Sequence, residues 1–180
     1  MAVAPSEPDL VFLHGGSHGS WCWDGLIRHL AGMGYGGRML ALDVPGCGAK
    51  RARRGEDMAL AQIAAELNGD VRAAGLGSAA TVVMGHSLAG ILLPMLHAHD
   101  PALYEAFIFL SASIPAEGQS VADLMGRRLQ GEDPARVGWP LDSANVSRRD
   151  LRTAMFCDDL DASTAAWLLD QVEQDHWPSA

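Results

Sequence analysis

The sequence predicts an α/β protein with a parallel sheet of about four strands, followed by a helical cap. Over the first 111 residues, short apolar runs alternate with longer helical patterns, as in repeated βα units. The stretches between these runs are long enough for helical crossovers, which parallel pairing requires. From Pro115 onward no strand candidate follows, and the helical stretches are broken by glycine and proline. We therefore assign residues 1–114 to an α/β core and residues 115–180 to a helical cap.

The four strand candidates are short apolar runs. They lie at Leu10–Leu13, Arg38–Leu42, Thr81–Met84 and Ala106–Leu110. We expect them to form one parallel sheet, so that the residues following each strand gather at the same edge.

Helices are expected wherever apolar residues recur every three or four positions. The first covers Trp23–Met33, and Gly34 supplies a C-terminal stop. The second is marked by Leu60, Ile63, Ala64, Leu67 and Val71. The third covers Leu88–Ala98.

Length and charge limit the possible functions. A chain of 180 residues can bury one substantial core. Its net charge is -9, and residues 91–180 hold 14 acidic against 6 basic side chains. Because such a surface repels phosphate backbones, we expect no nucleic-acid binding. The basic cluster Lys50, Arg51, Arg53 and Arg54 is interpreted as a solvated loop.

The three cysteines are widely spaced and odd in number, a pattern that predicts neither a disulfide framework nor a metal site. The first residues lack a basic stretch followed by an apolar run, and no apolar stretch approaches the length of a membrane span. We therefore expect a cytoplasmic protein that binds no membrane and uses no metal or cofactor.

The segment Thr81 to Gly90 carries the strongest chemical signal. An apolar strand runs into Ser87, which has small residues two positions before and after it, and a helix follows. This is the context of a nucleophile elbow, a strained turn that exposes a serine hydroxyl at the end of a strand. The Leu88 amide at the start of the helix can then stabilise a developing oxyanion. Ala89 stands where the usual pattern has glycine.

A glycine-rich loop, His14 to Trp21, directly follows the first strand. Backbone amides in such a bend can face a ligand, and we predict that the Gly16 amide is the second oxyanion donor. The neighbouring residues expected to line a pocket are His14, Gly15, Ser17 and His18, with Trp139 from the cap. A phosphate-binding loop is a weaker alternative, since neither G-x-G-x-x-G nor a lysine-bearing phosphate loop can be aligned.

Together these motifs resemble one branch of the α/β-hydrolase fold, which contains plant methylesterases, salicylate-binding esterases, bacterial pyrethroid-type esterases and hydroxynitrile lyases. The likeness continues into the segments Phe107 to Pro115 and Phe156 to Asp159. The resemblance implies a serine esterase with Ser87 as nucleophile, an oxyanion hole from Gly16 and Leu88, and a cap shaping a pocket for a small apolar ester or thioester.

The resemblance also implies a catalytic aspartate and histidine after two further strands beyond the cap. Because this sequence ends near the start of the first of those strands, we expect a C-terminally truncated fold that lacks its last strands. The general base therefore stays unassigned, and His176 is the one candidate in the tail. Asp43, at the end of the second strand, is expected to hold a loop.

Three functions remain open. The first is ester hydrolysis, impaired by a missing base. The second is cyanohydrin lysis, but Gly15 stands where the plant lyases of this branch have threonine, which favours the esterase. The third is a non-catalytic remnant that binds small molecules. The apolar strand Ala106–Leu110 would form an unpaired edge, which we expect to drive aggregation or dimerisation.

Overall fold

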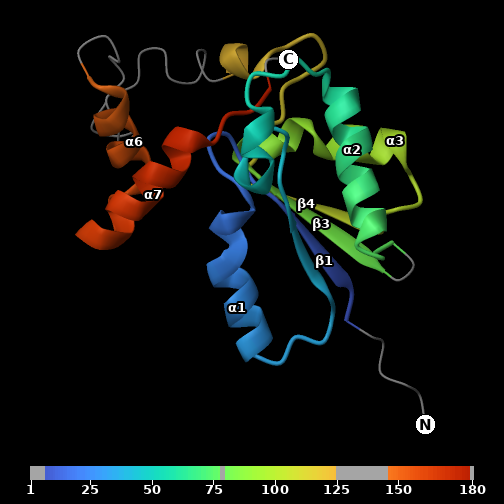
Figure 1. Ribbon diagram of the computed structural model, residues 1–180. Helices are drawn as coiled ribbons and strands as arrows, with labels where there is room; N and C mark the ends of the chain where they lie inside the picture. The colour runs from blue at the N-terminus through green and yellow to red at the C-terminus, as the bar shows by residue number, and fades with distance from the viewer. Residues whose placement is uncertain (1–6, 78–79, 125–145, 179–180) are drawn as a thin grey trace. The chain divides into compact units, whose positions relative to one another are not determined.

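The predicted parallel sheet is present in the computed structural model, which describes residues 7–77, 80–124 and 146–178 (Figure 1). Its strands are β1 (Asp9–Leu13), β2 (Met39–Leu42), β3 (Thr81–His86) and β4 (Ala106–Leu110). They run in the order β2-β1-β3-β4, and each neighbouring pair is parallel. The prediction of one parallel sheet is thus confirmed. Leu13 pairs with Gly85, so the residues that follow β1 and β3 are neighbours at one edge.

Helices cover both faces of this sheet (Figure 1). The 3-10 helix η1 (Ser20–Trp23) leads into α1 (Asp24–Gly32). Gly34, with a φ of +86°, lies just after the C-terminal end of α1. On the opposite face lie α2 (Leu60–Ala73) and α3 (Leu93–His99), while the 3-10 helix η2 (Gly48–Arg53) follows β2.

The third predicted helix differs from the expectation. Instead of one helix over Leu88–Ala98, a 3-10 helix η3 (Ser87–Ile91) is followed by a separate α3. Pro94 stands in the first turn of α3, where its missing N–H costs no hydrogen bond. In the middle of a continuous helix the same proline would remove a hydrogen bond and clash with the preceding turn, so the helix begins anew.

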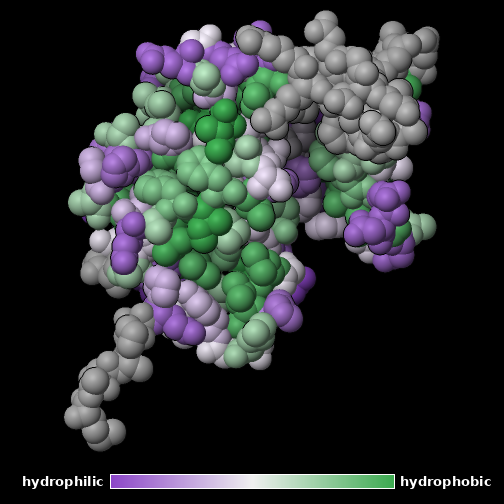
Figure 2. Space-filling model, turned by 180° about the vertical axis from the view of Figure 1, so that it is seen from behind, coloured by the Kyte–Doolittle hydropathy of each residue, from purple (hydrophilic) through white to green (hydrophobic). Residues whose placement is uncertain are grey.

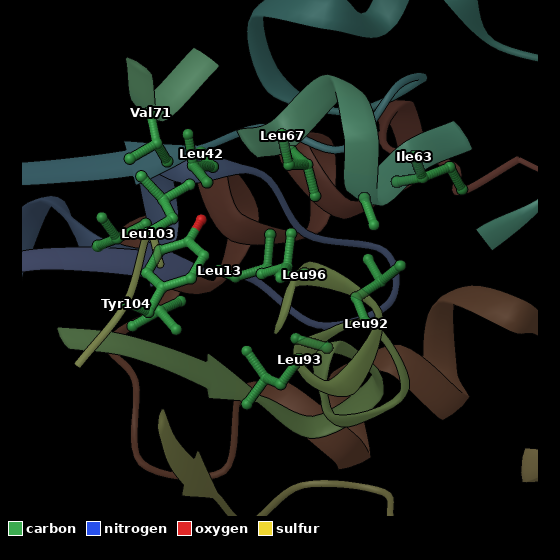
Figure 3. Packing of buried hydrophobic residues seen from close by; sticks show 14 of the residues in the cluster. Leu13, Leu42, Ile63, Leu67, Val71, Leu92, Leu93, Leu96, Leu103 and Tyr104 are labelled. Atoms are coloured by element: carbon green, nitrogen blue, oxygen red, sulfur yellow. The ribbon is translucent and has the colours of Figure 1, made fainter. Parts of the chain in front are cut away.

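The main core lies between the sheet and the pair α2 and α3. Its apolar side chains are buried, and Figure 3 shows them gathered between the helices and the strands. The fully buried members include Leu13, Ile63, Leu67, Val71, Leu92, Leu93 and Leu96. The periodic residues predicted for α2 supply Ile63, Ala64, Leu67 and Val71 to this cluster.

Apolar surface remains exposed away from this core. Helix α1 has no buried residue. Strand β4 forms one edge of the described sheet, and its Ile108, Phe109 and Leu110 are 40%, 41% and 42% exposed. Figure 2, the view from behind, shows hydrophobic residues gathered over much of the face in sight.

The chain divides into two compact units. The first contains residues 1–114 and 175–180, and the second residues 115–174. The residues 175–177, which the sequence analysis placed in the cap, therefore belong to the first unit. The reason is physical: these residues make hydrogen bonds to the loops that follow β1 and β2.

The second unit contains α6 (Arg148–Phe156) and α7 (Ala162–Gln174). Ser147 caps α6 by accepting from the Asp150 amide at 3.0 Å. Asp161 accepts from the Thr164 amide at 3.0 Å before α7. Trp139 lies outside the described residues. Among the helices that the structure describes, none is both long and apolar enough to cross a membrane.

The basic cluster after β2 is largely balanced by acidic side chains. Three of its four members form ion pairs: Lys50 with Glu66 and Asp70, Arg51 with Asp175, and Arg53 with Glu56 and Glu66. Their charge is therefore compensated within the fold.

Candidate active site

Ser87 lies at the turn between β3 and η3. Its φ is +54°, in the left-handed region that non-glycine residues rarely adopt. Although η3 is counted from Ser87, this φ is not helical, so the residue belongs to the turn rather than to the helix. The side chain is half-buried. A serine held in this strained backbone after a strand is the arrangement expected of a nucleophile elbow.

Close packing explains the small residues around Ser87. A Cβ on Gly85 would come within 3.0 Å of the Leu93 side chain. Ala89 is fully buried, whereas a Cβ on Gly90 would lie 2.3 Å from the Ser113 carbonyl oxygen. Position 90 therefore requires glycine, whereas position 89 accommodates an alanine.

The segment after β4 also holds the elbow directly. The Ser113 amide donates to the Ser87 carbonyl oxygen at 2.8 Å. This bond fixes the backbone of the strained residue from the side of the neighbouring strand. Ser113 lies in the segment Phe107 to Pro115, which shares the family likeness, but nothing in its sequence pattern predicts a bond to Ser87.

The glycine-rich loop passes close to the elbow. A Cβ on Gly15 would lie 2.9 Å from the Ser87 Cβ and 3.1 Å from the His86 carbonyl oxygen. A Cβ on Gly16 would lie 3.3 Å from the Leu88 side chain. The structure thus brings Gly15, Gly16, Ser87 and Leu88 together, as their places after adjacent strands predict. The glycines permit this close approach of two backbone segments.

The surroundings of the two amides predicted to form an oxyanion hole can be described in part. Among the described residues, none accepts a hydrogen bond from the Gly16 amide. The Leu88 amide lies in the first turn of η3, where backbone amides have no intrahelical partner. That the two amides converge on one point stays a prediction.

His14 orients the loop and is not placed to transfer protons. It is fully buried, and its Nε2 accepts from the Val44 amide at 3.1 Å. The ring proton therefore sits on Nδ1, which donates to the Gly15 carbonyl at 2.8 Å. Burial lowers the pKa of His14 to about 4, so the ring is neutral near pH 7.

His18 supports the same loop from its other side. Its Nδ1 lies 2.9 Å from the Gly16 carbonyl oxygen, and its ring stacks on Trp21 with centroids 5.1 Å apart. Burial lowers the pKa of His18, and the nearby His86 acts in the same direction. Ser17, between them, has a φ of +58°. Of the residues predicted to line a pocket, Gly15 thus lies beside Ser87, while His14 and His18 hold the backbone of the loop.

Two carboxylates anchor the far end of the loop. Asp43 accepts from the Ser20 amide at 2.6 Å and from the Ala49 amide at 2.9 Å. The interpretation of Asp43 as a residue that holds a loop is confirmed. Asp175 is fully buried and accepts from the Trp21 indole at 2.6 Å, the Gly48 amide at 2.8 Å and Arg51 Nε at 2.5 Å.

Burial alone would raise the pKa of Asp175. The hydrogen bonds from Arg51, Trp21 and Gly48 outweigh burial and lower the pKa below its ordinary value. The carboxylate is therefore ionised and serves as a structural anchor. No sequence signal marked Asp175, because its partners are 124 to 154 positions away in the chain.

Two further tail residues reach the first unit. The His176 amide donates to the Gly46 carbonyl at 3.1 Å, and the Trp177 indole donates to the Gly15 carbonyl at 3.1 Å. The buried Nδ1 of His176 has no hydrogen-bond partner in the described part of the chain. None of the described residues forms a hydrogen bond with the Ser87 hydroxyl. His176 therefore stays a candidate base only.

Comparisons with known proteins agree with this geometry. Residues 10–179 match the alpha/beta hydrolase family. "Probable esterase PIR7A" of Oryza sativa subsp. indica is 38% identical over 109 residues, which cover 61% of this chain and 40% of that protein. "Esterase PIR7B" of Oryza sativa subsp. japonica is 30% identical over 114 residues, covering 63% and 42%. The matched region thus spans about two fifths of these curated relatives.

Solved structures share the fold. An extracellular alpha/beta-hydrolase from a Paenibacillus species superposes with a TM-score of 0.67 at 19% identity, covering 92% of this chain and 65% of that one. Polyneuridine aldehyde esterase gives a TM-score of 0.57 at 24% identity, covering 71% and 49%. Among the described residues, no group of histidine, cysteine, aspartate and glutamate side chains could hold a metal ion.

Proposed function

Because this chain belongs to the alpha/beta hydrolase family, we propose that it hydrolyses small carboxylic esters or thioesters through an acyl intermediate on Ser87. The observation that carries the proposal is the left-handed Ser87 at the end of β3, beside a Gly16 amide that has no acceptor in the part of the chain that the structure describes. The relatives that are named esterases support the same class of reaction.

The geometry supports two chemical steps. The Ser87 oxygen attacks the ester carbonyl carbon, and the electron pair of the C=O bond moves onto the carbonyl oxygen. The Gly16 and Leu88 amides donate to this oxyanion where its charge develops. Collapse of the intermediate breaks the bond to the alcohol, which leaves with the serine proton. Water then attacks the acyl-serine, releases the acid and returns a proton to Ser87.

The base is the open part of this mechanism. With no hydrogen-bond partner among the described residues, the Ser87 hydroxyl is a weak nucleophile near neutral pH. We therefore expect the 180-residue chain to turn over slowly, at about 10³ to 10⁴ times the uncatalysed rate, which oxyanion stabilisation and binding alone can supply. His176 is the residue in the tail to test as base.

Gly15 favours esterase over lyase chemistry. A threonine at this position would place its Cβ 2.9 Å from the Ser87 Cβ and 3.1 Å from the His86 carbonyl oxygen. Real Cβ atoms do not approach neighbours so closely, so the lyase residue does not fit this backbone. We expect a small, apolar ester as substrate. The alternative, a phosphate-binding loop, is disfavoured because the loop from His14 to Trp21 contains no lysine.

Two further proposals concern the protein as a whole. The exposed apolar side chains of β4 and its place at the sheet edge support association of two copies through this strand. The cytoplasmic location inferred from the cysteine pattern stays a prediction.

Hydrolysis of p-nitrophenyl acetate and trapping by a fluorophosphonate test the function together. We expect the probe to add its phosphonyl group to Ser87, seen by mass spectrometry, and Ser87→Ala to abolish both labelling and hydrolysis. Ser111→Ala is the matched control, because Ser111 also has a positive φ, +43°, directly after a strand. Labelling elsewhere, or hydrolysis that survives Ser87→Ala, would contradict the proposal. Binding of the ester without any turnover would instead support the non-catalytic alternative.

A further inference from the structure

The Gly15 carbonyl accepts two hydrogen bonds from ring N–H groups. His14 Nδ1 donates at 2.8 Å, and the Trp177 indole Nε1 donates at 3.1 Å. The two rings also meet edge to face, with centroids 6.1 Å apart and an interplanar angle of 89°. One donor belongs to the loop itself, whereas the other comes from a segment 162 positions away.

This carbonyl belongs to the same peptide unit as the Gly16 amide. A trans peptide is planar, and its C=O and N–H bonds point in opposite directions. Whatever fixes the direction of the Gly15 carbonyl therefore also fixes the direction of the Gly16 N–H. Glycines on both sides of this peptide leave its rotation otherwise weakly restricted.

We propose that Trp177 is a positioning residue that orients the Gly16 N–H toward the oxyanion formed at Ser87. The proposal rests on the proposed function, in which Gly16 is an oxyanion donor. Trp177 acts only through the Gly15–Gly16 peptide and contacts no reacting atom. Its indole supplies what His14 alone does not, a second donor that holds the carbonyl from outside the loop.

The segment that carries Trp177 is itself firmly held. Asp175, two residues earlier, is a buried carboxylate with hydrogen bonds from Trp21, Gly48 and Arg51. The His176 amide donates to the Gly46 carbonyl at 3.1 Å. Trp177 also packs against the main core. Its indole is therefore a fixed donor rather than a mobile surface group.

The first test measures the Gly16 amide without relying on turnover. In the ¹H–¹⁵N spectrum of the whole chain, we expect Trp177→Phe to shift and broaden the Gly16 amide signal, because the peptide loses one of its two anchors. Trp23→Phe is the matched control. Trp23 is buried, and its indole nitrogen has no partner among the described residues, so the same substitution removes a similar ring without a hydrogen bond. An unchanged Gly16 signal in Trp177→Phe would overturn the proposal.

The second test separates positioning from general stability. For p-nitrophenyl acetate, Trp177→Phe should lower kcat by about tenfold or more while KM changes less than about twofold, since the interaction matters only in the transition state. Trp23→Phe should leave kcat within about twofold, and urea denaturation should show comparable stability losses for both variants. Equal kcat values in the two variants would refute the positioning role.

Failure of the function and failure of this inference give different results. If Ser87→Ala leaves hydrolysis intact, the proposed nucleophile is wrong, and the positioning role of Trp177 in catalysis falls with it. If Ser87→Ala abolishes hydrolysis but Trp177→Phe behaves like Trp23→Phe in both measurements, the nucleophile stands and only the role of Trp177 is wrong.

Discussion

Acidification should destabilise the fold through His14. The buried neutral ring has a pKa of about 4, against 6.5 for an exposed histidine. As the pH falls below 6.5 the unfolded chain binds a proton that the folded chain does not, so stability is lost between pH 6.5 and pH 4. Below pH 4 both states are protonated and this loss stops. The difference between the two pKa values corresponds to about 3 kcal/mol, and roughly three quarters of it should be lost by pH 4.5.

The structural cause is specific. His14 Nε2 accepts from the Val44 amide, and a proton on Nε2 would remove that acceptor. His14→Gln keeps an acceptor and a donor on a side chain that does not titrate. It should lower stability at pH 7.5 but flatten the pH dependence.

Urea denaturation followed by circular dichroism between pH 7.5 and pH 4.5 gives the free energies needed. His29→Gln, an exposed histidine on α1, is the control and should follow the wild-type profile. If the wild type and His14→Gln lose stability in parallel, the buried ring does not govern the acid response, and this reasoning is wrong.

Three substitutions test other parts of the fold. Gly90→Ala should lower the free energy of unfolding in urea by about 2 kcal/mol and slow the labelling of Ser87, because the new Cβ would lie 2.3 Å from the Ser113 carbonyl oxygen. Gly69→Ala is the control and should not destabilise the fold, because a Cβ at this position would meet no atom within 4 Å. Asp161→Ala should lower the free energy of unfolding by about 1 kcal/mol, because the hydrogen bonds that Asp161 accepts at the start of α7 are lost. Asp161→Asn should keep most of these bonds, so an equal loss of stability in both variants would exclude a capping role. Phe109→Lys places a charge on the exposed edge strand β4, so light scattering should show a monomer where the wild type forms the expected dimer. A wild type that stays monomeric at high concentration would exclude pairing through β4.

Local patterns were sufficient to predict the sheet. Each strand contains a continuous apolar run, which is typical of parallel sheets, and β4 has the predicted bounds although its side chains are partly exposed. The serine turn was also predictable, since the strand, the small residues and the following helix are close together in sequence. What the pattern did not predict was the break at Pro94, because apolar spacing continues through it.

The supports of the candidate site could not be predicted in this way. The Trp177 bond to Gly15 joins residues 162 positions apart, and the Asp175 bonds span similar separations. A pairing of this kind leaves no periodicity in the sequence. The tail after α7 was assigned to the cap for that reason, although its side chains complete the loop after β1. Only the fold shows which distant residues meet.

The discontinuity of the first unit has a consequence for the order in which the site is built on the ribosome. The elbow and the glycine-rich loop are synthesised within residues 1–114, whereas Trp177 and Asp175 follow after the 60 residues of the second unit. At about 5 to 20 residues per second, roughly 3 to 12 s separate the two parts of the unit. During that interval the nascent chain carries its serine turn beside a loop that lacks two of its anchors. The Gly15 carbonyl can therefore gain its bond from Trp177 only after the second unit has been translated.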